Sequence, residues 1–224
     1  MRNRLGSATW AAMAKAKICG LTTPEAVDAA LAGGAAYVGF VFFPKSPRNL
    51  DPADAARLAA PARSRAKVAA VVVDPDDALL DRIVQALQPD LIQLHGRETP
   101  ERTAQIRART GAATAKAVPV ATAEDLAAAA AYEPVADYLM LDAKAPAGAD
   151  LPGGNGAAFD WSLPAGRSFL RPWFLAGGLD PTNVTEALRL SGAPLVDVSS
   201  GVERSPGYKD PRLISAFLDA VRRA

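Results

Sequence analysis

The chain offers few side chains for acid–base chemistry, because its 224 residues include a single cysteine and a single histidine. The cysteine, Cys19, lies in the segment KICG at 17–20. If this segment is a strand, Lys17 and Cys19 share one face and Ile18 lies on the other. An ammonium beside a thiol favours the thiolate, which can accept a proton, although a free thiol titrates near ~8.5. Cys19 is therefore either a general base or a small buried hydrophobic residue.

Two further acid–base candidates follow apolar runs. Asp142 comes directly after YLML, and an apolar setting can raise the pKa of a carboxyl group until it serves as a proton donor. The alternative for Asp142 is a cap on the segment that follows it. The histidine, His95, ends the run QLH, and either a substrate contact or a structural hydrogen bond would explain it.

Anion-binding groups follow other apolar runs. Arg48 closes the segment FFPKSPR, and its guanidinium can hold a carboxylate or a phosphate through two parallel hydrogen bonds. The alternative is a solvated basic loop. Small residues in LAGGLDPTN and VDVSSGVE can surround a phosphate with amides and hydroxyls: Gly177, Gly178, Ser199, Ser200 and Gly201. Asp197 shares a strand face with Ser199 and could accept a hydrogen bond from a substrate hydroxyl.

Elements that could position these groups recur along the chain. From residue 15, short apolar runs alternate with alanine-rich amphipathic stretches, a rhythm typical of β-α repeats. We predict eight strands, at 15–20, 36–42, 67–73, 90–95, 113–118, 137–141, 172–177 and 194–200. Cap signals predict helix starts at 22–25, 51–54, 74–77, 122–125 and 180–183, where Asp or Thr, often before proline, suits an N-cap.

The strand count favours an α/β fold of one domain, a (β/α)₈ TIM barrel, which commonly spans 200 to 250 residues. The alternative is an open doubly wound sheet, but no G-x-G-x-x-G follows the first strand. In a barrel, the loops after the strands carry the chemistry, and phosphate is commonly held after strands seven and eight. The candidate residues above fall at such strand ends.

Composition limits the partners and the compartment. Basic and acidic residues number 25 and 24 and are spread along the chain, so nucleic acid and membrane surfaces are not expected partners. A lone cysteine and a lone histidine provide neither a disulfide nor a tetrahedral zinc site. The first twenty residues lack an apolar run of seven, which disfavours a signal peptide. We predict a cytoplasmic protein, monomeric or homodimeric, that binds a small molecule.

Two segments differ from the regular pattern of the predicted barrel domain, 13–224: the residues before it and the connection between strands six and seven. We expect residues 1–12 to be a disordered or irregular lead, with Met13 as an alternative start. Between strands six and seven lies AKAPAGADLPGGNGAAFDW, rich in Gly, Ala and Pro, which is either a disordered connection or a loop that closes over a ligand.

Together these segments resemble phosphoribosylanthranilate isomerase, the barrel enzyme of tryptophan biosynthesis. The resemblance covers residues 15 to about 222 and rests on seven blocks in order: KICGLTTPEA, YVGFVFFPKSPR, QLHG, LMLD, FDWS, FLAGGL, and VDVSSGVE with PGYKD. Two features depart from the pattern. The residues 1–12 have no counterpart, and Ala158 stands where a lysine is expected before Phe159.

The resemblance implies an Amadori rearrangement of N-(5-phosphoribosyl)anthranilate to 1-(2-carboxyphenylamino)-1-deoxyribulose 5-phosphate, without metal or organic cofactor. It implies that Asp142 is the general acid, Cys19 the general base and Arg48 the group that holds the anthranilate carboxylate. The phosphate would bind at the small residues after strands seven and eight. His95 and Asp197 match family blocks, and we expect them to position the substrate.

Other functions remain in view. Indole-glycerol-phosphate synthase would require a catalytic lysine, for which Lys116 near the end of strand five is the candidate. A metal-using ribulose-phosphate epimerase would require several histidines, and there is one. A degenerate barrel that only senses a phosphorylated ligand, or a purely structural barrel, would not need Cys19, Asp142 and Arg48 together.

Overall fold

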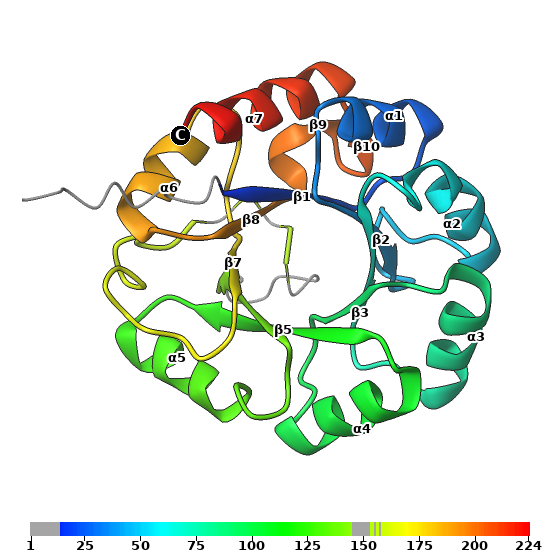
Figure 1. The fold of residues 1–224 in the computed structure, drawn as a ribbon, viewed down its shortest axis with the longest axis horizontal. Helices are drawn as coiled ribbons and strands as arrows, with labels where there is room; N and C mark the ends of the chain where they lie inside the picture. Colours follow the sequence, from blue (N-terminus) through cyan, green and yellow to red (C-terminus); the bar gives the residue numbers. More distant parts are fainter. Residues whose placement is uncertain (1–13, 145–152, 155, 157) are drawn as a thin grey trace, which may run out of the picture.

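The barrel predicted from the strand count is the fold of this chain. The computed structural model describes residues 14–144, 153, 154, 156 and 158–224. Eight parallel strands close in chain order into a barrel, and helices surround it (Figure 1). The strands are β1 Lys15–Cys19, β2 Tyr37–Phe42, β3 Lys67–Val72, β4 Leu91–Leu94, β5 Ala113–Val120, β6 Tyr138–Ala143, β7 Trp173–Leu175 and β8 Leu195–Val198. All eight were predicted, with bounds that shift by a few residues.

Seven α-helices cover the barrel in the described part of the chain. They are α1 Pro24–Ala32, α2 Pro52–Ala59, α3 Asp77–Leu87, α4 Pro100–Thr110, α5 Ala123–Ala127, α6 Val184–Ser191 and α7 Pro211–Arg223. Short 3-10 helices are η1 Ala60–Ala62, η2 Ala128–Ala131 and η3 Ser200–Val202. A small antiparallel pair, β9 Glu203–Ser205 and β10 Tyr208–Lys209, follows β8 and was not predicted.

Three of the five predicted helix starts are confirmed. Thr23, Asp51 and Thr122 each accept a hydrogen bond from a backbone N–H in the first turn of the helix that follows. Such a bond satisfies a donor that the helix itself leaves free. Thr122 also completes a capping box with Asp125.

The other two predicted segments, 74–77 and 180–183, also contain the N-cap of a helix, but the cap is a later residue than the Asp before proline. Asp74 adopts a positive φ of 44° and accepts the N–H of Arg97, so Asp76 becomes the cap of α3. Asp180 accepts the N–H groups of Thr182 and Asn183 and closes a turn, so α6 begins only at Val184. At Asp180 a side-chain turn competes with the helix for the same backbone donors, whereas the side chain of Asp74 is bound to the loop after β4.

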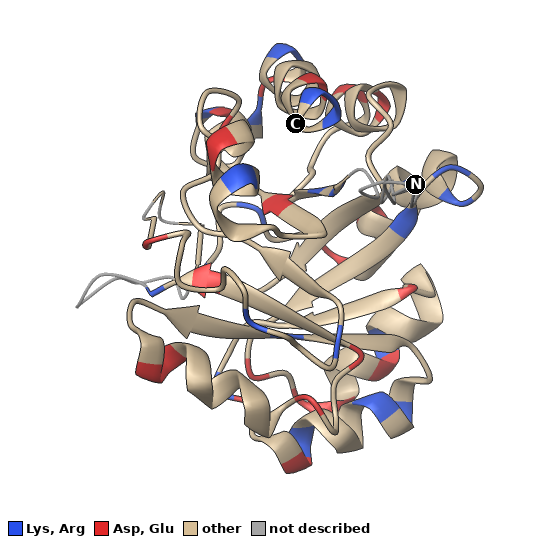
Figure 2. Cartoon of the chain, turned by 60° about the vertical axis from the view of Figure 1, so that its left-hand side comes forward, with Lys and Arg blue, Asp and Glu red and all other residues tan. Residues whose placement is uncertain are grey.

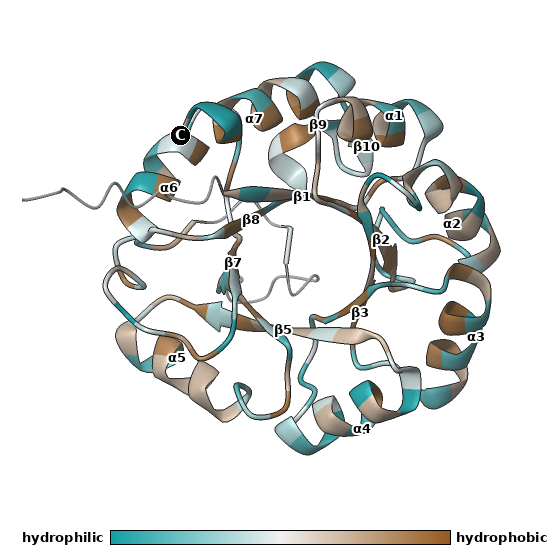
Figure 3. Ribbon diagram, in the orientation of Figure 1, coloured by the Kyte–Doolittle hydropathy of each residue, from teal (hydrophilic) through white to brown (hydrophobic). Residues whose placement is uncertain are grey.

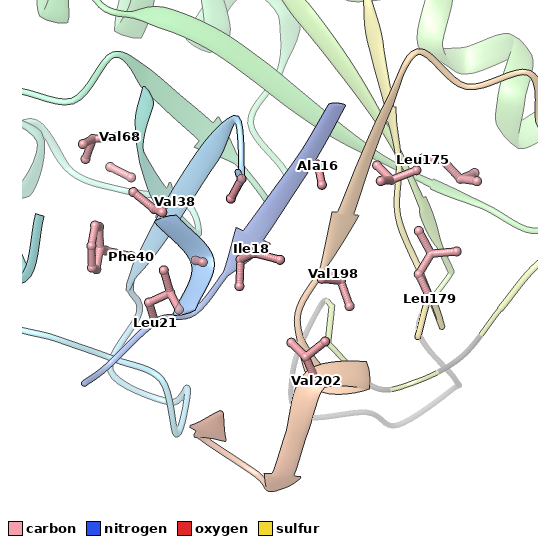
Figure 4. Packing of buried hydrophobic residues seen from close by; sticks show 14 of the residues in the cluster. Ala16, Ile18, Leu21, Val38, Phe40, Val68, Leu175, Leu179, Val198 and Val202 are labelled. Carbon is pink, nitrogen blue, oxygen red and sulfur yellow. The ribbon is translucent and has the colours of Figure 1, made fainter. Parts of the chain in front are cut away.

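The strands alternate between an outer and an inner face. Ile18, Val38 and Phe40 are completely buried on the outer face, in the layer between strands and helices (Figure 4). This confirms that Ile18 packs outward. Helices turn their hydrophobic faces to this layer and their hydrophilic faces outward (Figure 3).

Aromatic side chains fill the inner face near the amino ends of the strands. The ring of Phe174 lies 5.3 Å from that of Tyr37 and 5.7 Å from that of Tyr138, measured between centroids. Because this part of the barrel is packed, the inward residues further along the strands, starting at Lys17 and Cys19, lie towards the open end. The aromatic layer at the amino ends of the strands thus closes the barrel below the polar side chains at the carboxyl ends.

Most charged residues lie on the helices and loops, and few lie on the barrel strands (Figure 2). Among the described residues, no helix is long and apolar enough to cross a membrane. The predicted lead at 1–12 falls outside the described residues.

Candidate active site

A pocket of about 820 Å³, its open mouth included, lies at the carboxyl ends of the strands. This volume is in the range of small-molecule sites. Nine of the ten candidate residues line it: Cys19, Arg48, His95, Asp142, Gly177, Gly178, Asp197, Ser199 and Ser200. The tenth, Gly201, is not among the lining residues. Barrel closure thus brings together groups from β1, β2, β4, β6, β7 and β8 and the loops that follow them.

Cys19 is buried on the inner face, and its neighbour Lys17 is already paired. Lys17 Nζ donates to Asp197 Oδ1 at 2.8 Å, and this ion pair joins β1 to β8. Burial raises the pKa of the Cys19 thiol; Lys17 opposes this effect, Asp197 adds to it, and the net shift is upward. Lys17 therefore lowers the pKa of the thiol as expected, but burial, with Asp197 adding to it, outweighs that effect.

Lys17 stays an ammonium in this setting. Burial lowers the pKa of Lys17, but the charges of Asp197 and Cys19 outweigh burial, so the net shift is upward. Gly39 on β2 makes room for its side chain, since a Cβ at Gly39 would lie 3.1 Å from Lys17 Cε. The pair thus occupies the barrel interior just below Cys19.

Asp142 is held by the only histidine. His95 Nε2 lies 2.9 Å from Asp142 Oδ2, and Gln93 Nε2 lies 2.9 Å from His95 Nδ1. If the Gln93 amide donates to Nδ1, the imidazole proton is on Nε2 and points at the carboxylate. The other oxygen, Asp142 Oδ1, accepts the N–H of Ala143, the last residue of β6, at 2.9 Å.

Two glycines of the β6–β7 connection reach the same site. A Cβ at Gly153 would lie 2.5 Å from His95 Nε2 and 2.8 Å from Asp142 Oδ2, so only glycine fits against this pair. Gly154 likewise borders Arg48. Residues 145–152, 155 and 157 of the predicted closing loop fall outside the described residues, and Ala158 is exposed.

Arg48 is buried rather than solvated, so a solvated basic loop describes Lys45 but not Arg48. Its guanidinium pairs with Glu203: Arg48 Nε donates to Oε1 at 2.7 Å and Nη2 to Oε2 at 2.8 Å. Burial raises the pKa of Glu203, but Arg48 and Lys209 outweigh it and hold that pKa below its ordinary value. Glu203 is therefore ionised and fixes one edge of the guanidinium.

The loops after β7 and β8 need glycine for two different reasons. Gly177 has a φ of +85°, and a Cβ there would lie 2.5 Å from the backbone nitrogen of Ala143. Gly201 packs against the backbone of the β7 loop, where a Cβ would overlap the carbonyl oxygen of Leu179. Gly201 therefore has a packing role, which holds the two loops together, and its predicted contact with phosphate stays a prediction.

Three functional candidates were missed from the sequence: Gln93, Glu203 and Lys209. Gln93 lies two residues before His95 on one strand, so the two-residue period could have paired them. Glu203 and Lys209 lie in the quoted segments VDVSSGVE and PGYKD, but nothing local shows that both turn back to Arg48 and Ser199. The hairpin β9–β10 makes that contact.

Lys116 does not lie at the mouth of the barrel. β5 extends to Val120, which places Lys116 in mid-strand, and its neighbours Ala115 and Ala117 take the inner face. Lys116 Nζ pairs with Glu98 Oε2 at 2.9 Å outside the barrel interior. Lys116, the candidate catalytic lysine of an indole-glycerol-phosphate synthase, thus belongs to a structural ion pair.

Comparison with known proteins agrees with the geometry. The profile of the family described as N-(5'phosphoribosyl)anthranilate (PRA) isomerase matches residues 16–220. The N-(5'-phosphoribosyl)anthranilate isomerase of Caulobacter sp. (strain K31) is 64% identical over 212 residues, which are 94% of this chain and 100% of the relative.

Solved structures give the same result. The crystal structure of phosphoribosyl anthranilate isomerase from Thermotoga maritima matches with a TM-score of 0.85 and 35% identity, covering 95% of this chain and 100% of that one. Another, solved in complex with reduced 1-(o-carboxyphenylamino)-1-deoxyribulose 5-phosphate, matches with a TM-score of 0.82 and 33% identity over 95% of this chain and 100% of that one. By sequence and by structure, this chain belongs to the N-(5'-phosphoribosyl)anthranilate isomerase family.

Proposed function

We propose that this chain carries out the reaction of its family with Asp142 as general acid and Cys19 as general base. The substrate is N-(5-phosphoribosyl)anthranilate, and the product is 1-(2-carboxyphenylamino)-1-deoxyribulose 5-phosphate, an intermediate of tryptophan biosynthesis. The observation that carries the assignment is that both groups border one pocket with Arg48 and the glycine- and serine-rich loops.

Ring opening is the step assigned to Asp142. Its protonated carboxyl group gives a proton to the furanose ring oxygen, while the anthranilate nitrogen lone pair forms the C1=N bond and the C1–O bond breaks. His95 lies against Oδ2 of the same carboxyl group and holds it in place. Positioned acids of this kind typically contribute 10²- to 10⁴-fold to the rate.

Isomerisation is the step assigned to Cys19. The thiolate removes the proton from C2 of the Schiff base, and the electron pair forms a C1=C2 bond in an enolamine. Tautomerisation then places a proton on C1 and leaves a ketone at C2. In the tautomerisation the C2 hydroxyl loses a proton while C1 gains one, so substrate and product have the same composition and no oxidant or reductant is needed. Transfer of the proton gained by Cys19 back to Asp142 through solvent restores both groups.

The anchors hold the sugar between these groups. Arg48 binds the anthranilate carboxylate, and Gly177, Gly178, Ser199 and Ser200 bind the phosphate from the two loops. Asp197 and His95 position the substrate. Fixing both ends reduces the entropic cost of bringing the sugar carbons to the acid and the base.

We also propose a compartment and an oligomeric state for the chain. The partner is the small phosphorylated substrate, whose charge keeps it inside the cytoplasm, and the chain acts there as a monomer or a homodimer. One solved relative is described as the mutually generated monomers of the dimeric enzyme of Thermotoga maritima. Light scattering on the purified chain distinguishes the two states.

The test of the reaction is turnover of freshly prepared N-(5-phosphoribosyl)anthranilate. We expect its anthranilate-type fluorescence to disappear in the presence of the chain and the ribulose phosphate product to accumulate. A folded chain that leaves the fluorescence unchanged would refute the assignment.

A further inference from the structure

The rim of the pocket contains a buried cluster of one carboxylate and two cations. The proposed reaction gives a role to Arg48 but none to Glu203 or Lys209. Side-chain exposure is 6% for Arg48, 4% for Glu203 and 1% for Lys209. Lys209 Nζ lies 2.7 Å from Glu203 Oε1, beside the two contacts from Arg48. Burying charges to this extent is costly unless each has a partner, so the three side chains depend on one another for their positions.

Glu203 fixes the orientation of the guanidinium. Its Oε1 accepts from Arg48 Nε and from Lys209 Nζ, while Oε2 accepts from Arg48 Nη2 and from the N–H of Gly207. A guanidinium has five N–H donors, and Glu203 takes one at Nε and one at Nη2. The remaining fork is the Nη1/Nη2 edge, and Arg48 Nη1 lies on the side of Gly154, which lines the pocket.

The hairpin β9–β10 holds Glu203 in this position. Gly207, at its turn, has a φ of +84°, and a Cβ there would lie 2.7 Å from the carbonyl oxygen of Pro47, the residue before Arg48. Lys209 also donates to the carbonyl oxygen of Ser199 at 2.9 Å and to its hydroxyl at 3.2 Å. The hairpin therefore connects the loop of Arg48 with the loop proposed to hold phosphate.

The cluster of Arg48, Lys209 and Glu203 has a net positive charge, which favours binding of an anion. Arg48 and Lys209 bring two positive charges and Glu203 one negative charge, so the cluster carries one uncompensated positive charge. Burial lowers the pKa of Lys209, and Glu203 opposes that effect without cancelling it. Arg48 and Lys209 both contact Glu203, so without it the two cations would repel each other. The guanidinium would also lose the contacts that orient its Nη1/Nη2 edge towards the pocket.

We propose that Glu203, supported by Lys209, is a positioning residue that aims the Nη1/Nη2 edge of Arg48 at the aromatic carboxylate and so makes that carboxylate a determinant of specificity. The proposal rests on the proposed function, in which Arg48 binds the anthranilate carboxylate. Glu203 acts through Arg48 and does not touch the reacting atoms.

The test compares two substrates that differ only in the carboxylate: N-(5-phosphoribosyl)anthranilate and N-(5-phosphoribosyl)aniline. For Glu203→Gln we expect kcat/KM on the first substrate to fall at least tenfold, mainly through KM, and kcat/KM on the second to change less than about twofold. In an Arg48→Ala background, Glu203→Gln should have no further effect on the carboxylate preference. Equal losses on both substrates, or losses that add to those of Arg48→Ala, would overturn the proposal.

A matched variant separates positioning from stability. Glu98 forms an equally buried pair with Lys116, with side-chain exposures of 1% and 3%, and neither residue lines the pocket. Glu98→Gln should lower the unfolding midpoint without changing the preference for the carboxylate. If Glu203→Gln does not fold, Glu203→Asp keeps the charge but shortens its reach, and it should weaken the carboxylate preference alone.

Binding provides a readout that does not require turnover. Titration calorimetry with reduced 1-(o-carboxyphenylamino)-1-deoxyribulose 5-phosphate, and with the same compound lacking the carboxylate, gives the carboxylate contribution in each variant. If the unmodified chain turns over neither substrate, the proposed function fails, while the affinities still decide the role of Glu203. An unchanged affinity ratio in Glu203→Gln would refute the positioning role.

Discussion

At the residue scale, the proposed chemistry divides between Cys19 and Asp142, and each has a distinct environment. Cys19 is buried above an ion pair whose carboxylate offsets the charge of Lys17. Asp142 instead shares a hydrogen bond with His95, which Gln93 orients from the same strand. Burial therefore keeps the proposed base mainly as a thiol in the free protein, and the contact with His95 fixes the direction of the proposed acid.

Replacement of either group is the first test at this scale. We expect Cys19→Ala and Asp142→Asn each to lower kcat by about 10²- to 10⁴-fold, because each removes one proton transfer. Substrate affinity should change little, since the anchors remain. Rapid-mixing fluorescence with excess enzyme separates binding from turnover. A Cys19→Ala variant with near-normal kcat would mean that another group is the base.

The pH dependence follows from the raised pKa of Cys19. The thiolate is the active form, so kcat/KM should still increase as the pH rises past about 8.5, the ordinary thiol value. The stability effect has the matching sign: the folded state favours the neutral thiol. That contribution is complete below the unfolded pKa and is lost as the pH rises through the folded pKa.

The pH test uses the ultraviolet absorbance of the thiolate in a titration, which belongs to Cys19 alone once the same titration of Cys19→Ala is subtracted. We expect the thiolate to appear above the ordinary range for cysteine. A thiolate already present at neutral pH would contradict the burial effect.

At the element scale, the loops after β7 and β8 depend on the close approach of Gly201 to Leu179. Gly201→Ala would place a Cβ on a carbonyl oxygen, and since backbone cannot yield as a side chain does, we expect about 1–3 kcal/mol of destabilisation. Because the movement separates the two loops proposed to hold phosphate, KM should also rise. Urea denaturation and steady-state kinetics measure the two effects.

Gly111 provides the comparison for that variant. It ends α4 with a φ of +65° and has no atom within 4 Å of an added Cβ. Gly111→Ala should cost only the left-handed backbone strain, about 1–2 kcal/mol, with KM unchanged. If Gly201→Ala leaves KM at its original value, the two loops do not share a ligand site.

At the scale of the whole molecule, the ion pair of Lys17 and Asp197 lies across the junction where β8 meets β1 and closes the barrel. Lys17→Met would leave Asp197 as a buried carboxylate without its partner, and we expect a loss of about 3–5 kcal/mol in the free energy of unfolding. The double variant Lys17→Met with Asp197→Leu removes both charges and should recover most of that loss.

Denaturant unfolding of the single and double variants measures this coupling. A Lys17→Met variant as stable as the original chain would show that solvent or a rearranged partner reaches Asp197. The double variant should remain folded but bind substrate weakly, since Asp197 is proposed to position it.

More of the fold than of the site could be predicted from the sequence. The short apolar runs predicted all eight strands, and the pattern of Asp and Thr caps predicted the cap residues of three helices, because these signals are local. The N-cap of α6 is Asn183 rather than Asp180, because the side chain of Asp180 closes a turn before the helix. Local pattern also placed Lys116 near a strand end, and the longer β5 corrected that.

The sequence by itself predicted the barrel and placed the candidates Cys19, Asp142 and Arg48 at strand ends, because side-chain type and the pattern of apolar runs are properties of neighbouring residues. Only the tertiary structure decided the charge environment of these groups. Asp197 lies 180 residues from Lys17, and Glu203 lies 155 from Arg48. Barrel closure and the hairpin after β8 bring them together, and since electrostatic effects depend on distance in space, no local pattern could reveal them.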